Sequence, residues 1–231
     1  MLSNGKKVAV MSLGGSLIIP DEIDLGFLRE FRKVIKNNTG KYKFVIVCGG
    51  GSVARKYISA LAEEGKSDYL QSLAGIAVTR LNARFMAYFF GKDPTWGIPH
   101  DMKSVENLLK KNDVVFCGAL RYADNQTSDA TACKLAAYFK SDFINLTNVK
   151  GLYDKNPNKY KDAKFIAHAT RQEFAKIVNA VAQKPGMHAP VDHSAMRIIQ
   201  KNKLCVFIIG KDAKQLDNML NGKKFIGSKI D

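Results

Sequence analysis

The fold is decided by two stretches, Val8-Ala9-Val10-Met11-Ser12-Leu13-Gly14-Gly15-Ser16 and Phe44-Val45-Ile46-Val47-Cys48-Gly49-Gly50-Gly51-Ser52. Each is an almost unbroken apolar run that ends in a glycine-rich turn. A short continuous run, rather than an alternating one, is typical of a strand that is buried on both faces. Such strands occur in parallel sheets covered by helices, so these stretches predict an α/β protein.

The rest of the chain repeats this alternation of strands and helices. Further strands are predicted over 114–117, 143–146 and 204–209, and helices over 24–38, 53–64, 70–90, 130–139, 171–183 and 194–202. Strands that alternate with helices imply right-handed crossovers and a mostly parallel central sheet covered on both faces. Since no low-complexity linker or internal repeat divides the sequence, we expect a single domain over residues 1–231.

The bulk composition narrows the class of protein. The chain has 231 residues, of which 46% are hydrophobic and 25% charged, as is ordinary for globular proteins. It has no apolar run long enough to span a membrane, and its N-terminus does not have the pattern of a signal peptide. The four cysteines lack paired spacing and lie among apolar residues, which predicts reduced buried thiols, a cytoplasmic location and no metal site.

The net charge of +15 is the one unusual bulk property. It favours anionic partners, either nucleic acids or phosphorylated metabolites. The basic residues form several small clusters, such as Arg29, Arg32, Lys33 and Lys36, without the interleaved aromatic residues of a nucleic-acid platform. We therefore expect small-molecule substrates and no nucleic-acid or membrane partner.

The two glycine turns are the first candidates for a binding site. Glycine lets the backbone approach a phosphate closely, and the helix start that follows offers free N–H groups. Neither turn matches GxxxxGK[ST], and GxGxxG is absent after the first strand, so the sequence is neither a P-loop kinase nor a typical dinucleotide enzyme. Another geometry for phosphate binding is required.

Several motifs, in order, resemble the amino-acid-kinase superfamily and, within it, the archaeal-type UMP kinases. They are Leu13-Gly14-Gly15-Ser16, Gly49-Gly50-Gly51-Ser52-Val53-Ala54-Arg55-Lys56-Tyr57-Ile58, Gly75-Ile76-Ala77-Val78-Thr79-Arg80-Leu81-Asn82-Ala83, Thr127-Ser128-Asp129-Ala130, Thr147-Asn148-Val149-Lys150-Gly151-Leu152-Tyr153, Ala189-Pro190-Val191-Asp192 and Gly227-Ser228-Lys229-Ile230. The resemblance covers the chain from about residue 8 to its end.

The resemblance implies a three-layer αβα sandwich and transfer of the ATP γ-phosphoryl group to UMP in pyrimidine nucleotide synthesis, with Mg²⁺, in a homo-oligomer that is commonly a hexamer. The N-terminal half would bind the acceptor and the C-terminal half ATP, with one shared sheet. The ATP site would comprise Gly15, Ser16, Gly51, Arg55, Thr147, Asn148, Tyr153 and Asn156. The UMP site would comprise Gly50, Ser72, Thr127 and Ser128.

Phosphoryl transfer needs two anionic groups to be aligned and their charge neutralised, with little covalent help. Arg55 and Arg197 could supply positive charge, and Asp129 could organise cationic groups or metal-bound water. Several of the candidate site residues also have a structural interpretation. Asp129 could cap the helix over 130–139, Arg55 could be a solvated helix residue, and Tyr153 could pack against the sheet edge. For Asp192 we favour capping of the next helix over a ligand role.

The sequence departs from the family pattern at several positions. Ser12 stands where many superfamily kinases carry lysine, and Ser72 stands where an acidic residue would contact the UMP ribose. The loop over 119–126 is long and lacks glycine, and Lys150 and Asn156 replace aspartates. A kinase for another phosphorylated acceptor, such as isopentenyl phosphate, therefore stays open, as does a non-catalytic protein that binds nucleotides or oxyanions.

Overall fold

The structure, a computed structural model, describes residues 5–93, 97–122, 127–182 and 191–231. Within these ranges seven strands form one sheet, in the order β3-β2-β1-β4-β8-β9-β7. The five strands from β3 to β8 in this order are parallel to their neighbours. They are β1 (Lys7–Leu13), β2 (Tyr42–Cys48), β3 (Val114–Cys117), β4 (Phe143–Leu146) and β8 (Val206–Ile209).

The remaining strands are short and lie toward the C-terminal half. Antiparallel to β8 runs β9 (Ser228–Ile230), which pairs in parallel with β7 (His168–Ala169). A separate antiparallel pair is formed by β5 (Leu152–Tyr153) and β6 (Phe165–Ile166). The prediction of a mostly parallel central sheet is thus confirmed.

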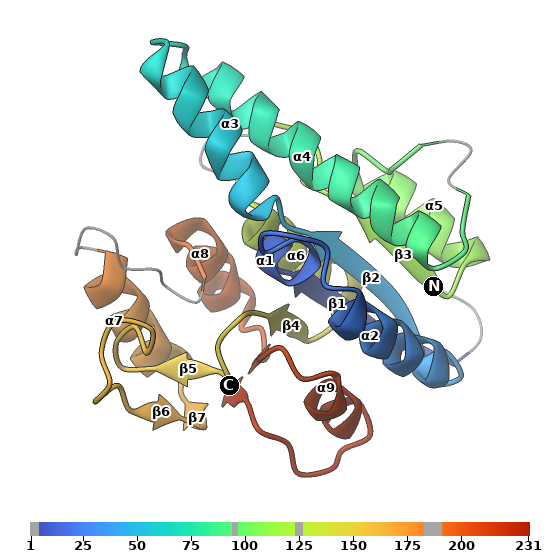
Figure 1. Cartoon of the computed structure of the whole chain (residues 1–231). Helices are drawn as coiled ribbons and strands as arrows, with labels where there is room; N and C mark the ends of the chain where they lie inside the picture. Colours follow the sequence, from blue (N-terminus) through green and yellow to red (C-terminus); the bar gives the residue numbers. More distant parts are fainter. Residues whose placement is uncertain (1–4, 94–96, 123–126, 183–190) are drawn as a thin grey trace.

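Helices connect these strands and flank the sheet (Figure 1). They are α1 (Gly15–Ile18), α2 (Leu25–Asn38), α3 (Gly51–Glu63), α4 (Asp68–Phe89), α5 (Met102–Lys111), α6 (Ser128–Phe139), α7 (Arg171–Ala182), α8 (His193–Asn202) and α9 (Ala213–Leu220). Every predicted helix is present with ends within two residues of the expected ones. Three helices, α1, α5 and α9, were not predicted, and each has ten residues or fewer.

The connections place helices on both faces of the sheet. From β1 the chain moves outward to β2 and β3, and it then returns past β1 to β4 and β8. Right-handed crossovers put the helices of the outward and return paths on opposite faces. Consistent with this, α6 packs against α8, whereas α2 packs against α9. The expected three-layer αβα sandwich is confirmed.

The core lies between the sheet and these helices. Val10, Met11 and Leu13 of β1 are fully buried, as is most of β2. On α2, the apolar stripe of Phe27, Leu28, Phe31, Val34 and Ile35 is buried. The helix begins after Asp24, whose Oδ1 accepts a hydrogen bond of 3.0 Å from the Phe27 N–H, and this cap satisfies one of the free donors of the first turn.

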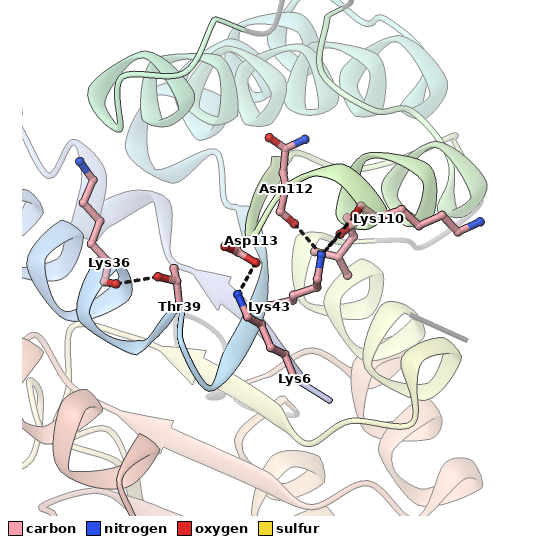
Figure 2. A network of polar contacts seen from close by, with 8 residues as sticks. Lys6, Lys36, Thr39, Lys43, Lys110, Asn112 and Asp113 are labelled. Carbon is pink, nitrogen blue, oxygen red and sulfur yellow. Dashed lines mark hydrogen bonds and ion pairs between the residues drawn. The ribbon is translucent and has the colours of Figure 1, made fainter. Parts of the chain in front are cut away.

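A buried lysine stabilises the side of the sheet near strand β3 (Figure 2). Lys43 of β2 is only 6% exposed, and its Nζ lies 2.6 Å from the Leu109 carbonyl and 3.4 Å from those of Lys110 and Asn112. These carbonyls belong to the end of α5, where the helix dipole is negative. The ammonium group thus satisfies carbonyls that a helix end leaves without an intrahelical donor.

Candidate active site

The candidate site lies where the strand order reverses. Strand β1 pairs with β2 on one side and with β4 on the other, so consecutive crossovers diverge from it. In open parallel sheets, ligands bind at the carboxyl ends of the strands at such a switch point. Here those ends lead into Gly14, Gly49 and Thr147.

The two glycine turns touch each other, backbone against backbone. A Cβ atom added to Gly15 would lie 2.2 Å from the Gly51 nitrogen, and one added to Gly49 would lie 2.8 Å from the Gly15 nitrogen. Gly51 has a φ of +63°, a conformation that residues with side chains adopt rarely. The turns therefore need glycine because they pack together, and they bring the N-terminal ends of α1 and α3 side by side.

The start of α3 offers free backbone N–H groups and the positive end of the helix dipole at the end of β2. Gly50 precedes this helix and packs closely, since a Cβ there would lie 2.4 Å from the Ala54 Cβ. Gly15, Ser16, Gly50 and Gly51, all predicted to face phosphates, thus occupy adjoining turns. Fixed N–H donors of this kind suit an anionic ligand.

Asp129 lies beside the end of β1. The Ser12 hydroxyl donates a hydrogen bond of 2.6 Å to its Oδ1, which joins β1 to the first turn of α6. Burial raises the pKa of Asp129 to about 6, the Ser12 hydrogen bond lowers it and nearby Asp192 raises it further. A carboxyl group that titrates near neutral pH beside a phosphate-type site can hold cations or bound water.

The alternative that Asp129 caps α6 is wrong. The N-cap is Thr127, whose Oγ1 accepts a hydrogen bond of 3.1 Å from the Ala130 N–H. Asp129 is the second helical residue, and its Oδ1 accepts from the Ser12 hydroxyl instead. Thr127 is the cap because it directly precedes the first helical residue, where its hydroxyl can accept from a free N–H of the first turn.

The prediction that Asp192 caps the following helix is confirmed. Its Oδ1 accepts from the N–H groups of Ser194 and Ala195 at 2.7 and 3.1 Å. The Thr127 hydroxyl donates to its other oxygen. The start of α6 is therefore tied to the start of α8, and Thr127 is held rather than free.

A cavity of about 820 Å³ lies between the α3–α4 pair and the starts of α6 and α8. It brings together three predicted site residues, Ser72, Thr127 and Arg197. The described residues that line it are Ile58, Asp68, Gln71, Ser72, Tyr122, Thr127, Asp192, His193, Ser194 and Arg197. Ser128 follows Thr127 as the first residue of α6.

Helix α4 positions the loop after β3, a role that the sequence did not reveal. The Thr79 hydroxyl accepts from the Ala119 N–H at 2.9 Å, and the Arg80 guanidinium donates to the Ala119 and Leu120 carbonyls at 3.2 and 2.7 Å. Asn82 donates to the Gly49 carbonyl at 2.8 Å. The motif Thr79-Arg80-Leu81-Asn82 therefore braces both the glycine turn and the loop that leads to Tyr122. Residues 123–126 of that loop lie outside the described residues, as do Ala189 and Pro190.

Arg55 occupies a different surface. It is exposed on α3 and lines a shallow cavity of about 470 Å³ with Ser52, Lys56 and Ser59. Among the described residues, no carboxylate forms an ion pair with its guanidinium, so its charge is available to a ligand. It lies one turn beyond Gly51, on the helix that begins at the glycine turn.

The remaining predicted ATP residues follow β4. Thr147 continues the sheet, since its N–H donates to the Ile209 carbonyl at 3.0 Å, and Asn148 next to it is exposed. Tyr153 of β5 packs edge-on against Phe165 at 5.5 Å between ring centroids, which agrees with the packing interpretation. Asn156 accepts from the Asn158 N–H at 2.9 Å and stabilises the turn that follows.

The described part of the chain holds no group of three or more His, Cys, Asp or Glu side chains that could bind a metal ion. No helix in the same ranges combines the length and the apolar character needed to cross a bilayer. Cys48, Cys117 and Cys133 are buried free thiols, and Cys205 is half-buried. Burial raises the pKa of all four, as expected of inert thiols.

Comparison with known proteins places this geometry among kinases. The chain is 31% identical over 223 residues to a uridylate kinase of Methanobrevibacter smithii, covering 96% of this chain and 97% of the relative. It is 33% identical over 225 residues to a uridylate kinase of Thermoplasma volcanium, covering 96% of both chains.

Solved structures agree. The crystal structure of uridylate kinase from Archaeoglobus fulgidus matches with a TM-score of 0.82 and 32% identity, covering 97% of this chain and 100% of that one. UMP kinase from Ureaplasma parvum matches in fold, with a TM-score of 0.77 and 19% identity over 97% of this chain and 98% of that one. Since the model of the amino acid kinase family also matches residues 7–210, the chain belongs to the amino acid kinase family.

Proposed function

We propose that this protein is a nucleoside monophosphate kinase that transfers the γ-phosphoryl group of ATP to UMP, giving UDP for pyrimidine nucleotide synthesis. The relatives that support this are named uridylate kinases and match nearly the whole chain. We further propose that the N-terminal half binds the acceptor and the C-terminal half ATP, within one domain over residues 1–231.

The observation that carries the choice of acceptor is the polar lining of the 820 Å³ cavity. Ile58 is the one aliphatic side chain among its described lining residues, and the rings are those of Tyr122 and His193. An isoprenoid tail would leave the hydrogen-bonding groups of this wall without partners, at a cost for each buried polar group. A nucleotide offers hydroxyl and carbonyl groups to them, so the lining favours UMP over isopentenyl phosphate.

The residues of the site have separate tasks in this reaction. The backbone N–H groups at Gly15, Ser16, Gly50 and Gly51 would hold phosphate oxygens at the adjoining turns. Phosphoryl transfer depends on such fixed donors, because they need no reorganisation when charge moves to the transition state. Arg197, which lines the acceptor cavity, would neutralise the acceptor phosphate.

The ATP side of the site would use the other predicted residues. Arg55 would meet the ATP phosphates from the first turns of α3, while Thr147, Asn148, Tyr153 and Asn156 would line the nucleotide pocket. Holding both substrates in line supplies much of the catalysis, since orientation removes an entropic barrier.

Mg²⁺ fits this donor set as an ion that arrives with the nucleotide. Magnesium is usually bound by one or two carboxylates together with substrate phosphates rather than by a protein cage. Asp129 supplies a carboxylate beside the strand ends, and Ser12 engages its Oδ1. When bound, the ion would neutralise charge on the phosphates, and Asp129 would hold it or its water.

We also propose that the protein is a cytoplasmic homo-oligomer, a hexamer by resemblance. Helices α3 and α4 form an antiparallel pair that extends beyond the sheet (Figure 1). Along α4, Leu70, Leu73, Leu81 and Tyr88 are exposed at helical spacing, and Leu81 is 63% exposed. An apolar stripe of this kind is typical of an interface, and a second copy of the chain would cover it.

A coupled assay of ADP release with UMP, CMP, dUMP and isopentenyl phosphate tests the function. We expect turnover with UMP above all others. A preference for isopentenyl phosphate would replace the acceptor, while ATP binding without turnover of any acceptor would refute the kinase assignment in favour of a binding protein.

A further inference from the structure

A second cavity lies at the edge of the sheet opposite the candidate active site. Its volume is about 590 Å³, which is within the range of pockets that hold small ligands. It is lined by the first residues of β1 and β2, the residues before β4, and the last residues of α6 and α9. The candidate active site lies instead at the carboxyl ends of the strands, and the two cavities share no described lining residue.

One part of the wall of this cavity is apolar and carries three rings. Tyr42, Phe139 and Phe207 are half-buried there and come from β2, α6 and β8. The Tyr42 hydroxyl donates to the Leu220 carbonyl at 2.9 Å, which ties this side chain to the end of α9. Rings grouped around one cavity suit a ligand that is itself aromatic, because aromatic pairs are favourable beyond the area that they bury.

Another part of the wall is cationic. Three lysines line the cavity, against the single aspartate Asp142 among its described lining residues. The Lys6 ammonium is neutralised by Asp113, 2.9 Å from its Oδ1 (Figure 2). Lys7 and Lys140 are exposed, and within the described ranges their ammonium groups form no ion pair and no side-chain hydrogen bond. Their positive charge is therefore available to an anion.

Lys140 occupies a backbone position that suits glycine better. It follows the last residue of α6 with a φ of +52°, in the left-handed region where helix ends prefer glycine. The helix end does not need the lysine side chain. The N–H groups of Lys140 and Ser141 already donate to the carbonyls of Ala137 and Ala136, at 3.2 and 2.9 Å. The chain thus places a charge at the cavity where glycine would relieve backbone strain.

We propose that this cavity is a second binding site, which takes a small aromatic anion. The ring of the ligand packs against Tyr42, Phe139 and Phe207, and its anionic group pairs with Lys7 and Lys140. A neutral aromatic molecule would leave the two ammonium groups without a partner, and an anion without a ring would leave the apolar wall in contact with water. This site is separate from the proposed kinase reaction, so the proposal stands or falls independently of the proposed function.

Fluorescence titration of the full-length protein tests the proposal. The probe is 8-anilinonaphthalene-1-sulfonate, an aromatic anion, and N-phenyl-1-naphthylamine is its uncharged analogue. Both are added in the presence of excess ADP and UMP, so that the candidate active site is occupied. We expect Lys7→Ala and Lys140→Gly each to weaken binding of the sulfonate by about two- to fivefold, as for an exposed charge pair. Their affinity for the uncharged analogue should not change, whereas Phe207→Leu should weaken the binding of both probes.

Lys203→Gly is the matched control. Lys203 also follows a helix with a left-handed φ, +51°, but it is outside the cavity lining. Its glycine variant should bind the sulfonate like the wild type. Thermal unfolding should show both glycine variants to be folded, since glycine adopts this φ without strain. The inference is overturned if Lys7→Ala and Lys140→Gly bind the sulfonate as the wild type does, if Lys203→Gly loses as much affinity as Lys140→Gly, or if ADP and UMP abolish the binding.

Discussion

Replacing Asp129 by asparagine should make the protein more stable at neutral pH and less active. Asparagine has nearly the same shape, and its carbonyl can still accept from Ser12, but it carries no charge. Burial raises the pKa of the carboxyl group from 3.8 to about 6, so the folded protein holds the ionised form at a cost in free energy. The substitution removes that cost.

The magnitude follows from the two pKa values. A rise from 3.8 to about 6 corresponds to about 3 kcal/mol, which is a ceiling because part of Asp129 is exposed to water. The native state keeps its proton to a higher pH than the unfolded state does, so the unfolding free energy falls as the pH rises from about 4 to about 6. Below this window the carboxyl group is neutral in both states and the cost disappears.

Urea unfolding of the wild type and Asp129→Asn at about pH 4 and about pH 8 measures this difference. From about pH 4 to about pH 8, the unfolding free energy of the variant should rise by up to about 3 kcal/mol relative to that of the wild type. The kinase activity of the variant should fall. Asp21→Asn, at an exposed position, serves as the control with little change. If the unfolding free energies of variant and wild type differ by the same amount at both pH values, the reasoning is refuted.

Three further perturbations test other parts of the site. In Ser12→Ala, loss of the hydrogen bond to Asp129 should raise the pKa of the Asp129 carboxyl group above about 6. The acidic limb of the pH–rate profile should therefore move up by about one to two pH units. If the limb does not move, the Ser12 hydrogen bond does not tune the pKa of Asp129. Gly15→Ala should lower the unfolding free energy by about 2–4 kcal/mol, since its Cβ would lie 2.2 Å from the Gly51 nitrogen. Gly40→Ala is the control, because a Cβ there meets nothing within 4 Å, and it should not lower the unfolding free energy in this way. Leu81→Glu should give a smaller species in sedimentation experiments if a second copy covers α4, and an unchanged mass would contradict that interface.

Local patterns in the sequence were sufficient for the fold. Continuous apolar strands such as 44–48 and the glycine turns that follow them predicted the parallel sheet, because both signals lie within a few residues. The same locality explains the failures. Strands of two or three residues, such as β5 and β9, are too short to show a period. Helix α5 does carry a local signal, because Val105 and Leu109 lie on its buried face, and that signal was missed.

Helix capping shows how far prediction from the sequence reaches at the level of single residues. The sequence placed Asp192 correctly as the cap of the next helix. In Thr127-Ser128-Asp129, all three side chains are able to cap, and only the position of the first helical turn decided for Thr127. Local propensity cannot choose between neighbouring residues of similar capping ability.

The sequence by itself thus determined the fold class, the glycine turns and the family resemblance, because these depend on residues that are close in the chain. Only the tertiary structure decided what those residues meet. Ser12 and Asp129 are 117 positions apart, and the acceptor cavity is assembled from α3, α4, α6, α8 and the loop after β3. Such contacts follow from strand register and helix packing, which join distant segments through the core and leave no periodic signal in the sequence.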